Sequence, residues 1–222
     1  MNTQDTWLKR HITLHDHQDR TSERENAISH GIASVLSLGF IFMIFALRNE
    51  FQSGSTYAGM IIFSFSQWIL FTSSTFYHYL EKGDMKRLFR IFDHSTIYFL
   101  IAGTYAPILL YINTPSTRLI FAAVYLFLIG GILSTIFWWG RFKVLHVILY
   151  LVMGWSIVFV WDEVVPNLPG RLISFIIAAG IQYTVGVLFY ALKKMNHGHL
   201  VWHILCMSAS ATFSTGFLLY FI

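Results

Sequence analysis

Residues 119–140 read LIFAAVYLFLIGGILSTIFWWG, a stretch of 22 residues without Asp, Glu, Lys or Arg. A helix of about 20 mostly apolar residues is long enough to cross the hydrocarbon core of a bilayer. Backbone groups inside lipid must find their hydrogen-bond partners within the segment, which a helix achieves by itself. This stretch therefore predicts a membrane-spanning helix, and the rest of the chain shows how many more there are.

The same pattern recurs along nearly the whole chain after residue 25. Seven runs of at least 18 residues lack the four charged residue types: 26–47, 51–80, 94–117, 119–140, 144–161, 172–192 and 195–222. A membrane barrel would instead show alternating segments of about 10 residues, which are absent. The sequence therefore predicts an all-α polytopic membrane protein, a seven-helix transmembrane domain at 26–222 that follows a polar cytoplasmic tail at 1–25.

Composition agrees with this fold class and excludes others. The 222 residues are 55% hydrophobic and 12% charged, whereas an average soluble domain is about 25% charged. Such a chain is too hydrophobic to be disordered. A single cysteine, Cys206, excludes a disulfide scaffold.

Basic residues are divided unevenly between the two sides that seven spans define. The tail and the second, fourth and sixth loops share one side and hold 12 of the 15 Lys and Arg residues. The other side holds only Arg48, Arg118 and Arg171. Because cytoplasmic loops carry the excess of Lys and Arg, the N-terminus is predicted to be cytoplasmic and the C-terminus outside. Basic loops near anionic lipid headgroups explain the positive charge, so no nucleic-acid partner is needed.

This topology places ionisable residues from three distant runs at one membrane depth. His78 closes the second helix, Asp93 lies where the third begins, and His199 and His203 open the seventh. Ser74 lies one turn deeper than His78. Residues at i and i+4 share a helical face, with Cβ atoms about 5–6 Å apart. That is the spacing at which two imidazoles on a helix bind one metal ion.

Three histidines with an open fourth position are typical of catalytic zinc, because structural zinc sites are closed by four protein ligands. Zinc lowers the pKa of its bound water to about 7. Asp93 could ligate the metal directly or hold the metal-bound water, and the Ser74 hydroxyl could bond the water, a ligand or a developing oxyanion. The alternative is that these residues are separate polar anchors at the membrane interface.

The residues around these positions resemble a known family. The segments that carry the resemblance are ENAISHG at 25–31, SSTFYH at 73–78, DHSTIY at 93–98, IAGTYAP at 101–107 and HLVWH at 199–203. They are similar to the haemolysin III family of bacterial membrane proteins, the prokaryotic branch of the progestin and adipoQ receptor group. The resemblance runs from about residue 25 to the end of the chain.

The resemblance implies a seven-helix bundle in the bacterial inner membrane with a cytoplasmic N-terminus. It implies Zn²⁺ held by His78, His199 and His203, with Asp93 holding the metal-bound water and Ser74 beside the site. It also implies a relationship to membrane hydrolases that include alkaline ceramidases. Membrane lipids, and a lipid or fatty-acid substrate, are the expected partners.

Three functions are compatible with these observations. The first is a zinc-dependent hydrolase of lipid-like amides or esters near the cytoplasmic face. The second is a non-enzymatic sensor or regulator of membrane state with structural zinc. The third is the cytolytic pore that the family name suggests, which is least favoured because no charge lies inside any of the seven runs.

Other histidines and the cysteine are weaker candidates. His30 and His146 lie near the cytoplasmic ends of their runs and could orient a ligand, although packing is the favoured interpretation. His94 points roughly 100° away from Asp93 around a helix, so it is not expected to be a co-ligand. We expect Cys206 to be a buried thiol rather than a metal ligand. We expect His11, His15 and His17 to belong to a solvated tail rather than to bind a metal ion.

Overall fold

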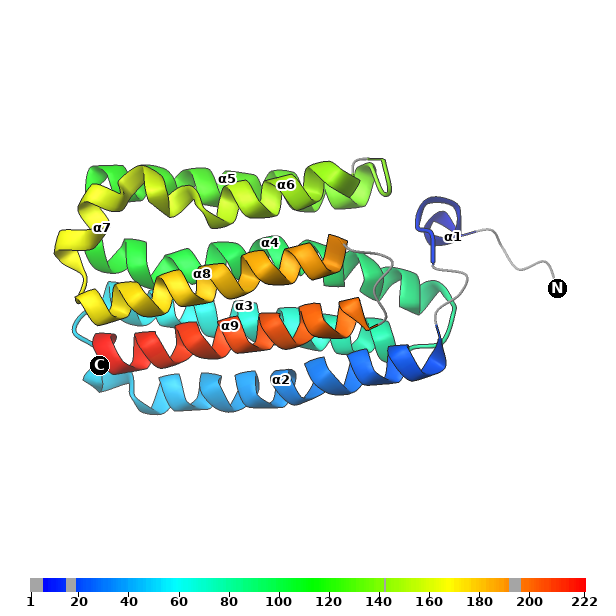
Figure 1. Ribbon diagram of the computed structural model, residues 1–222, viewed down its shortest axis with the longest axis horizontal. Coiled ribbons are helices and arrows are strands. Elements are labelled where there is room, and N and C mark those ends of the chain that lie inside the picture. The colour runs from blue at the N-terminus through cyan, green and yellow to red at the C-terminus, as the bar shows by residue number, and fades with distance from the viewer. Residues whose placement is uncertain (1–5, 15–18, 142, 192–196) are drawn as a thin grey trace.

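The computed structural model describes residues 6–14, 19–141, 143–191 and 197–222, and these contain helices and no strand. The long helices run side by side in a bundle (Figure 1). The elements are α1 (Trp7–His11), α2 (Arg20–Ala46), α3 (Gly54–Tyr79), α4 (Asp84–Ile112), α5 (Pro115–Phe137), α6 (Lys143–Gly154), α7 (Trp161–Asn167), α8 (Gly170–Ala191) and α9 (Gly198–Phe221), with 3-10 turns at Arg48–Glu50 and Ser156–Val160. The all-α prediction is confirmed.

Six helical segments in the described chain are long and apolar enough to cross a membrane. They are Arg20–Ala46, Asp84–Ile112, Pro115–Phe137, Val144–Asn167, Gly170–Ala191 and Gly198–Phe221. The predicted run at 51–80 folds as α3, which has 26 residues but is not among these six. The sequence predicted seven spans, and the composition of the folded helices supports six.

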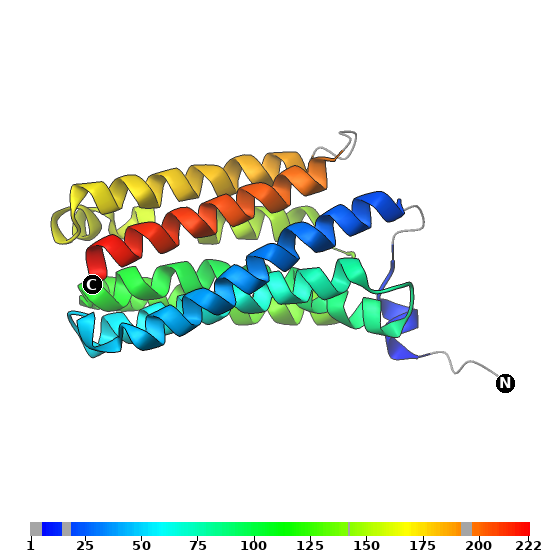
Figure 2. The ribbon, with the colours of Figure 1, turned by 90° about the horizontal axis from the view of Figure 1, so that it is seen from below.

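α3 is deeply buried and carries several buried hydroxyl and amide side chains. Ser64, Ser66 and Gln67 are each at most 4% exposed. Ser64 donates to the Met60 carbonyl oxygen at 2.6 Å and Ser66 to that of Phe63 at 2.7 Å. These hydroxyls lower the hydropathy of α3 without leaving unpaired groups, because each bonds its own helix. α3 packs along both α2 and α4 (Figures 1 and 2).

α3 and α4 approach closely at a glycine. A Cβ atom on Gly59 would lie 2.7 Å from the Ala106 carbonyl oxygen and 2.7 Å from the Pro107 Cα. Small residues allow helix backbones to meet in lipid, where van der Waals packing drives association. This contact lets the backbones of α3 and α4 pack closely against each other.

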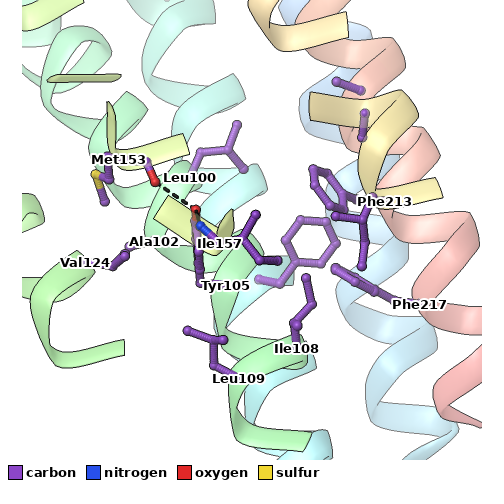
Figure 3. Packing of buried hydrophobic residues seen from close by; sticks show 14 of the residues in the cluster. Leu100, Ala102, Tyr105, Ile108, Leu109, Val124, Met153, Ile157, Phe213 and Phe217 are labelled. Carbon is purple, nitrogen blue, oxygen red and sulfur yellow. Dashed lines mark hydrogen bonds between the residues drawn. The ribbon is translucent and has the colours of Figure 1, made fainter. Parts of the chain in front are cut away.

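The segment between α6 and α7 is tied to α4 by a buried tyrosine. The helical path breaks after Gly154, and Tyr105 Oη donates to the Met153 carbonyl oxygen at 2.8 Å (Figure 3). Tyr105 Oη also accepts from the Ile157 N–H at 3.0 Å. A broken helix at membrane depth needs such partners for its freed backbone groups. The run predicted at 144–161 is thus an interrupted helix that continues to Asn167.

Two helices begin earlier than the charge-free runs suggested. α2 starts at Arg20 rather than near residue 26, and α4 starts at Asp84 rather than near Asp93. Two charged residues in these first turns pair with each other, Lys86 of α4 and Glu23 of α2. A run without charges marks the apolar depth of the membrane, whereas a helix can extend beyond it.

The N-terminal segment, which was expected to be a loose tail, packs on the start of α4. Ile12 is 1% exposed, and its carbonyl oxygen accepts from Arg87 Nε at 3.1 Å. Thr6 Oγ1 donates to Asp84 Oδ2 at 2.6 Å. The predicted loop cations Lys193 and Lys194 lie outside the described residues.

The two ends of the bundle hold different elements. α1, the end of α3, the start of α4 and the start of α9 lie at one end, which we call the site end (Figure 1). The start of α3 and the C-terminus lie at the other, the far end.

Candidate metal site

Three histidines meet at the site end from two helices. His78 is in the last turn of α3, His199 is in the first turn of α9, and His203 follows one turn later. One nitrogen from each ring lies within 4.8 Å of the others. His78 is 3% exposed and His203 is 1% exposed, while His199 is partly exposed. The helical spacing and the topology thus bring together the three residues predicted as ligands.

The spacing of one pair of nitrogens fits two ligands of a tetrahedral ion. His78 Nε2 and His199 Nε2 are 3.2 Å apart. Zinc binds imidazole nitrogen at about 2.0–2.1 Å, and tetrahedral angles then separate two ligand nitrogens by about 3.4 Å. Three neutral imidazoles are also a donor set that suits zinc. The described residues can therefore hold a metal ion, whose identity the geometry leaves open.

Two of the three rings are held from outside the cluster by α2. His78 Nδ1 lies 3.1 Å from Glu23 Oε1, and His203 Nδ1 lies 3.1 Å from Ser29 Oγ. The His30 ring stacks on the His203 ring, with centroids 3.5 Å apart and planes 6° apart. His30 therefore packs against a predicted ligand and is not a member of the cluster.

Lys86 supports the same corner of the site. Its Nζ lies 2.5 Å from Glu23 Oε2 and donates to the carbonyl oxygens of Tyr77 at 2.8 Å and Leu80 at 3.0 Å. The ammonium is buried, with the residue 4% exposed. A buried charge needs a partner and further hydrogen bonds, and Lys86 has both.

Asp93 and Ser74 lie near the histidines without joining the ligand cluster. Asp93 is 9% exposed, interacts electrostatically with His78, and has Oδ2 3.4 Å from His94 Nδ1. Ser74 is fully buried, and its hydroxyl interacts with the Asp93 carboxylate. The two groups therefore lie next to each other beside the histidines.

An apolar cavity begins one helical turn deeper than the site. Its smaller lobe, about 90 Å³, is lined by Leu70, Ile97 and Cys206 among others. These residues follow Ser74, Asp93 and His203 by one turn toward the bundle centre. A larger lobe of about 270 Å³ shares five lining residues with the first: Thr104, Gly154, Trp155, Gly180 and Phe213.

The weaker sequence candidates have other partners. His94 Nδ1 lies 3.0 Å from the Arg90 carbonyl oxygen, and His146 Nδ1 lies 2.7 Å from Tyr98 Oη. Cys206 is buried at 2% exposure, and His11 stacks on Trp7. His15 and His17 lie outside the described residues.

Comparison with known proteins places the chain in a family. A family model described as haemolysin-III related matches residues 18–214, a range that includes every residue of the site. The chain belongs to the haemolysin III family. The resemblance inferred from the motifs is therefore confirmed.

Several relatives support this membership of the haemolysin III family. The chain is 34% identical over 190 residues to Hemolysin-3 of Bacillus cereus, covering 85% of this chain and 87% of the relative. It is 35% identical over 190 residues to a Hemolysin-3 homolog of Bacillus subtilis (strain 168), covering 85% and 89%. The human monocyte to macrophage differentiation factor is 27% identical over 152 residues, covering 64% and 61%. No solved structure gives a significant match.

Sequence reasoning missed the roles of Glu23 and Ser29 in this haemolysin III protein. Residues before 26 were assigned to the tail because of their charges, so Glu23 was not considered. A usable signal was present, since Glu23, Asn26 and His30 follow an i, i+3, i+7 pattern. Polar residues on one face of an otherwise apolar helix face the bundle interior.

Proposed function

We propose that this haemolysin III family member is a zinc-dependent membrane hydrolase of lipid-like amides or esters. The observation that carries the proposal is the cluster of three histidines at the site end, with an apolar cavity that begins one helical turn deeper in the bundle. Hydrolysis of a lipid-like amide or ester needs a metal site for the scissile bond and apolar space nearby for the acyl chain.

The residues that would hold the ion are His78, His199 and His203. Bound zinc would supply a Lewis acid that polarises a carbonyl oxygen and lowers the pKa of water to about 7. The described residues offer three imidazoles and no fourth ligand within the cluster, which is the arrangement of catalytic rather than structural sites.

Asp93 and Ser74 are the proposed catalytic residues. The Asp93 carboxylate would accept the proton of the attacking water. It is the acidic group of α4 that interacts with His78. The Ser74 hydroxyl would donate a hydrogen bond to the carbonyl oxygen of the scissile bond as negative charge develops there.

The cavity would hold the acyl chain of the substrate. The lobes are lined mainly by apolar side chains such as Leu70, Ile97 and Ile176, and they contain no acid or basic residue. Apolar pockets with a few polar groups at one end are typical of ligand sites. A hydrophilic pore is less well supported, because the interior path beyond the site is apolar.

For the membrane arrangement we propose seven spans in the bacterial inner membrane, with α3 as the span that hydropathy does not reveal. The site end would face the cytoplasm, because the basic residues of α1 and of the start of α4 gather there. Single cysteines introduced at Lys82 and Arg118 test this orientation. A membrane-impermeant maleimide applied to spheroplasts should label the second and spare the first, and the reverse labelling would contradict the orientation.

The hydrolase proposal is tested by metal analysis combined with lipid analysis. Purified wild type should contain about one zinc per chain, His78→Ala and His199→Ala should lose it, and Asp93→Ala should keep it but lose lipid turnover. Equal metal in all four proteins would contradict the site. Stoichiometric zinc without any lipid difference from His203→Ala would exclude the enzyme and favour a regulator with structural zinc, whose melting temperature should fall on zinc removal.

A further inference from the structure

α2 contributes no residue to the histidine cluster, yet it contacts two of the three rings. Glu23 Oε1 lies 3.1 Å from His78 Nδ1, and Ser29 Oγ lies 3.1 Å from His203 Nδ1. For His78, this nitrogen is not the one that lies 3.2 Å from His199 Nε2. The contacts come from residues six positions apart on one helix, so α2 as a unit sets the position of both rings.

The Glu23 contact selects one tautomer of His78. A carboxylate only accepts hydrogen bonds, so His78 Nδ1 must carry the proton. The lone pair of a neutral imidazole is then on Nε2, the atom that lies 3.2 Å from His199 Nε2. Metal-ligating histidines are commonly oriented by such a donation to an outer acceptor.

The Ser29 contact gives the same result for His203 by a separate route. Ser29 Oγ donates its only proton to the Asn26 carbonyl oxygen at 2.9 Å. The hydroxyl can therefore only accept from His203, which places the proton on Nδ1 and leaves Nε2 as the metal-binding atom. The stacked ring of His30 fixes the plane of His203 in addition.

Lys86 holds Glu23 in place for this task. It binds Oε2, the oxygen that His78 does not use, and so leaves Oε1 for the imidazole. It also donates to the carbonyl oxygens of Tyr77 and Leu80, which flank His78 in the chain. One buried ammonium thus fixes both the acceptor and the backbone that carries the ring.

His199 is different from the other two rings. It is partly exposed in the first turn of α9, and its Nδ1 has no hydrogen bond among the described residues. The site therefore has two rings with an outer contact from α2 and one without such a contact.

We propose that Glu23 and Ser29 are positioning residues, which preset the Nε2 atoms of His78 and His203 for a metal ion. The proposal rests on the metal site proposed above. It predicts that metal affinity depends on α2, although α2 supplies no ligand. Removing an outer partner of a ligating histidine commonly weakens metal binding by about 10- to 100-fold.

The test compares Glu23→Ala, Glu23→Gln and Ser29→Ala with a matched control, Glu25→Ala. Glu25 lies two residues from Glu23 on α2 and pairs with His197 at 3.0 Å, outside the cluster. Zinc affinity is measured by competition with a chelator, and the visible absorption of the Co²⁺-loaded protein reports ligand geometry. We expect about 10- to 100-fold weaker zinc binding in Glu23→Ala with an altered Co²⁺ spectrum. The control should stay within about twofold of the wild type.

Glu23→Gln separates the acceptor from the charge. Its amide oxygen can still accept from His78, so it should recover part of the affinity and a wild-type-like Co²⁺ spectrum, and it serves as the informative variant if Glu23→Ala fails to fold. Lower melting temperature with unchanged affinity and spectrum in the Glu23 and Ser29 variants would overturn the positioning role alone. Wild type that binds no zinc or Co²⁺ would overturn the proposed function and this inference together.

Discussion

The two ends of the bundle join the same helices with different chemistry. At the site end, α3 and α9 meet through the imidazoles of His78, His199 and His203. Toward the far end they meet through aromatic rings, with Phe63 and Phe217 5.1 Å apart at 83°. Paired polar groups contribute little net stability, whereas close apolar packing drives helix association in lipid. The far end therefore stabilises the bundle, which leaves the site end free to carry function.

The largest expected effect is the loss of metal from the site end. His203→Ala removes one of three ligands and should abolish detectable zinc in the purified protein, while Phe213→Leu, which changes an aromatic partner, should keep it. Elemental analysis of detergent-purified protein measures both. Zinc loss in Phe213→Leu as well would show that metal binding at the site end depends on the aromatic packing toward the far end.

The next effect is on stability at the far end. Phe63 is fully buried and contacts the rings of Phe217 and Phe213. Phe63→Ala should cost about 3–5 kcal/mol of unfolding free energy through the lost packing and the cavity. Thermal unfolding followed by size-exclusion chromatography measures it, with Phe42→Ala as the control, since Phe42 is 66% exposed. A larger loss in the control would contradict the assignment of the core.

A third prediction concerns the cavity that lies between the two ends. A Cβ on Gly180 would have only Trp155 near it, at 4.0 Å, so Gly180→Leu can fill the cavity without a backbone clash. It should lower kcat/KM for a lipid substrate by roughly 10-fold, because space for the acyl chain is lost. Zinc content should stay at the wild-type level. Unchanged kinetics with every active lipid would mean that the cavity holds no substrate.

The smallest expected effect concerns the polar contact between α3 and α9 at mid-depth. Gln67 Nε2 lies 3.3 Å from Ser214 Oγ. Ser214→Ala should reduce stability by about 0.6 kcal/mol, the average for side-chain hydrogen bonds between membrane helices. Urea or SDS titration of the folded fraction can resolve a change of this size. A loss comparable to that of Phe63→Ala would remove the contrast between polar and aromatic contacts.

The residues that the sequence predicted well are those that depend on topology alone. Charge-free runs define the long helices, and the order of these runs places His78, His199 and His203 at one end. The outer contacts of Glu23 and Ser29 could not be predicted, because they depend on how α2 is rotated against α3 and α9. The positions of the charged residues along the sequence give no information about that rotation.

The limits of the helices were predicted less well, for a physical reason. Membrane depth is set by the absence of charge, but α4 continues for nine residues before Asp93 because its charged side chains are paired. The break after Gly154 was also missed. It depends on Tyr105, more than 40 residues away, which bonds the freed backbone.

The hydropathy of α3 also bears on how the chain enters the membrane. Insertion of a helix depends on its hydrophobicity, and α3 is the one long described helix that falls short by composition. In the seven-span arrangement proposed above, α3 would be retained in the bilayer by its neighbours rather than by its own partitioning. We therefore expect α2, α3 and α4 to be inserted as one unit, so that a chain truncated after α3 should leave that helix outside the bilayer, whereas a chain that extends through α4 should insert it.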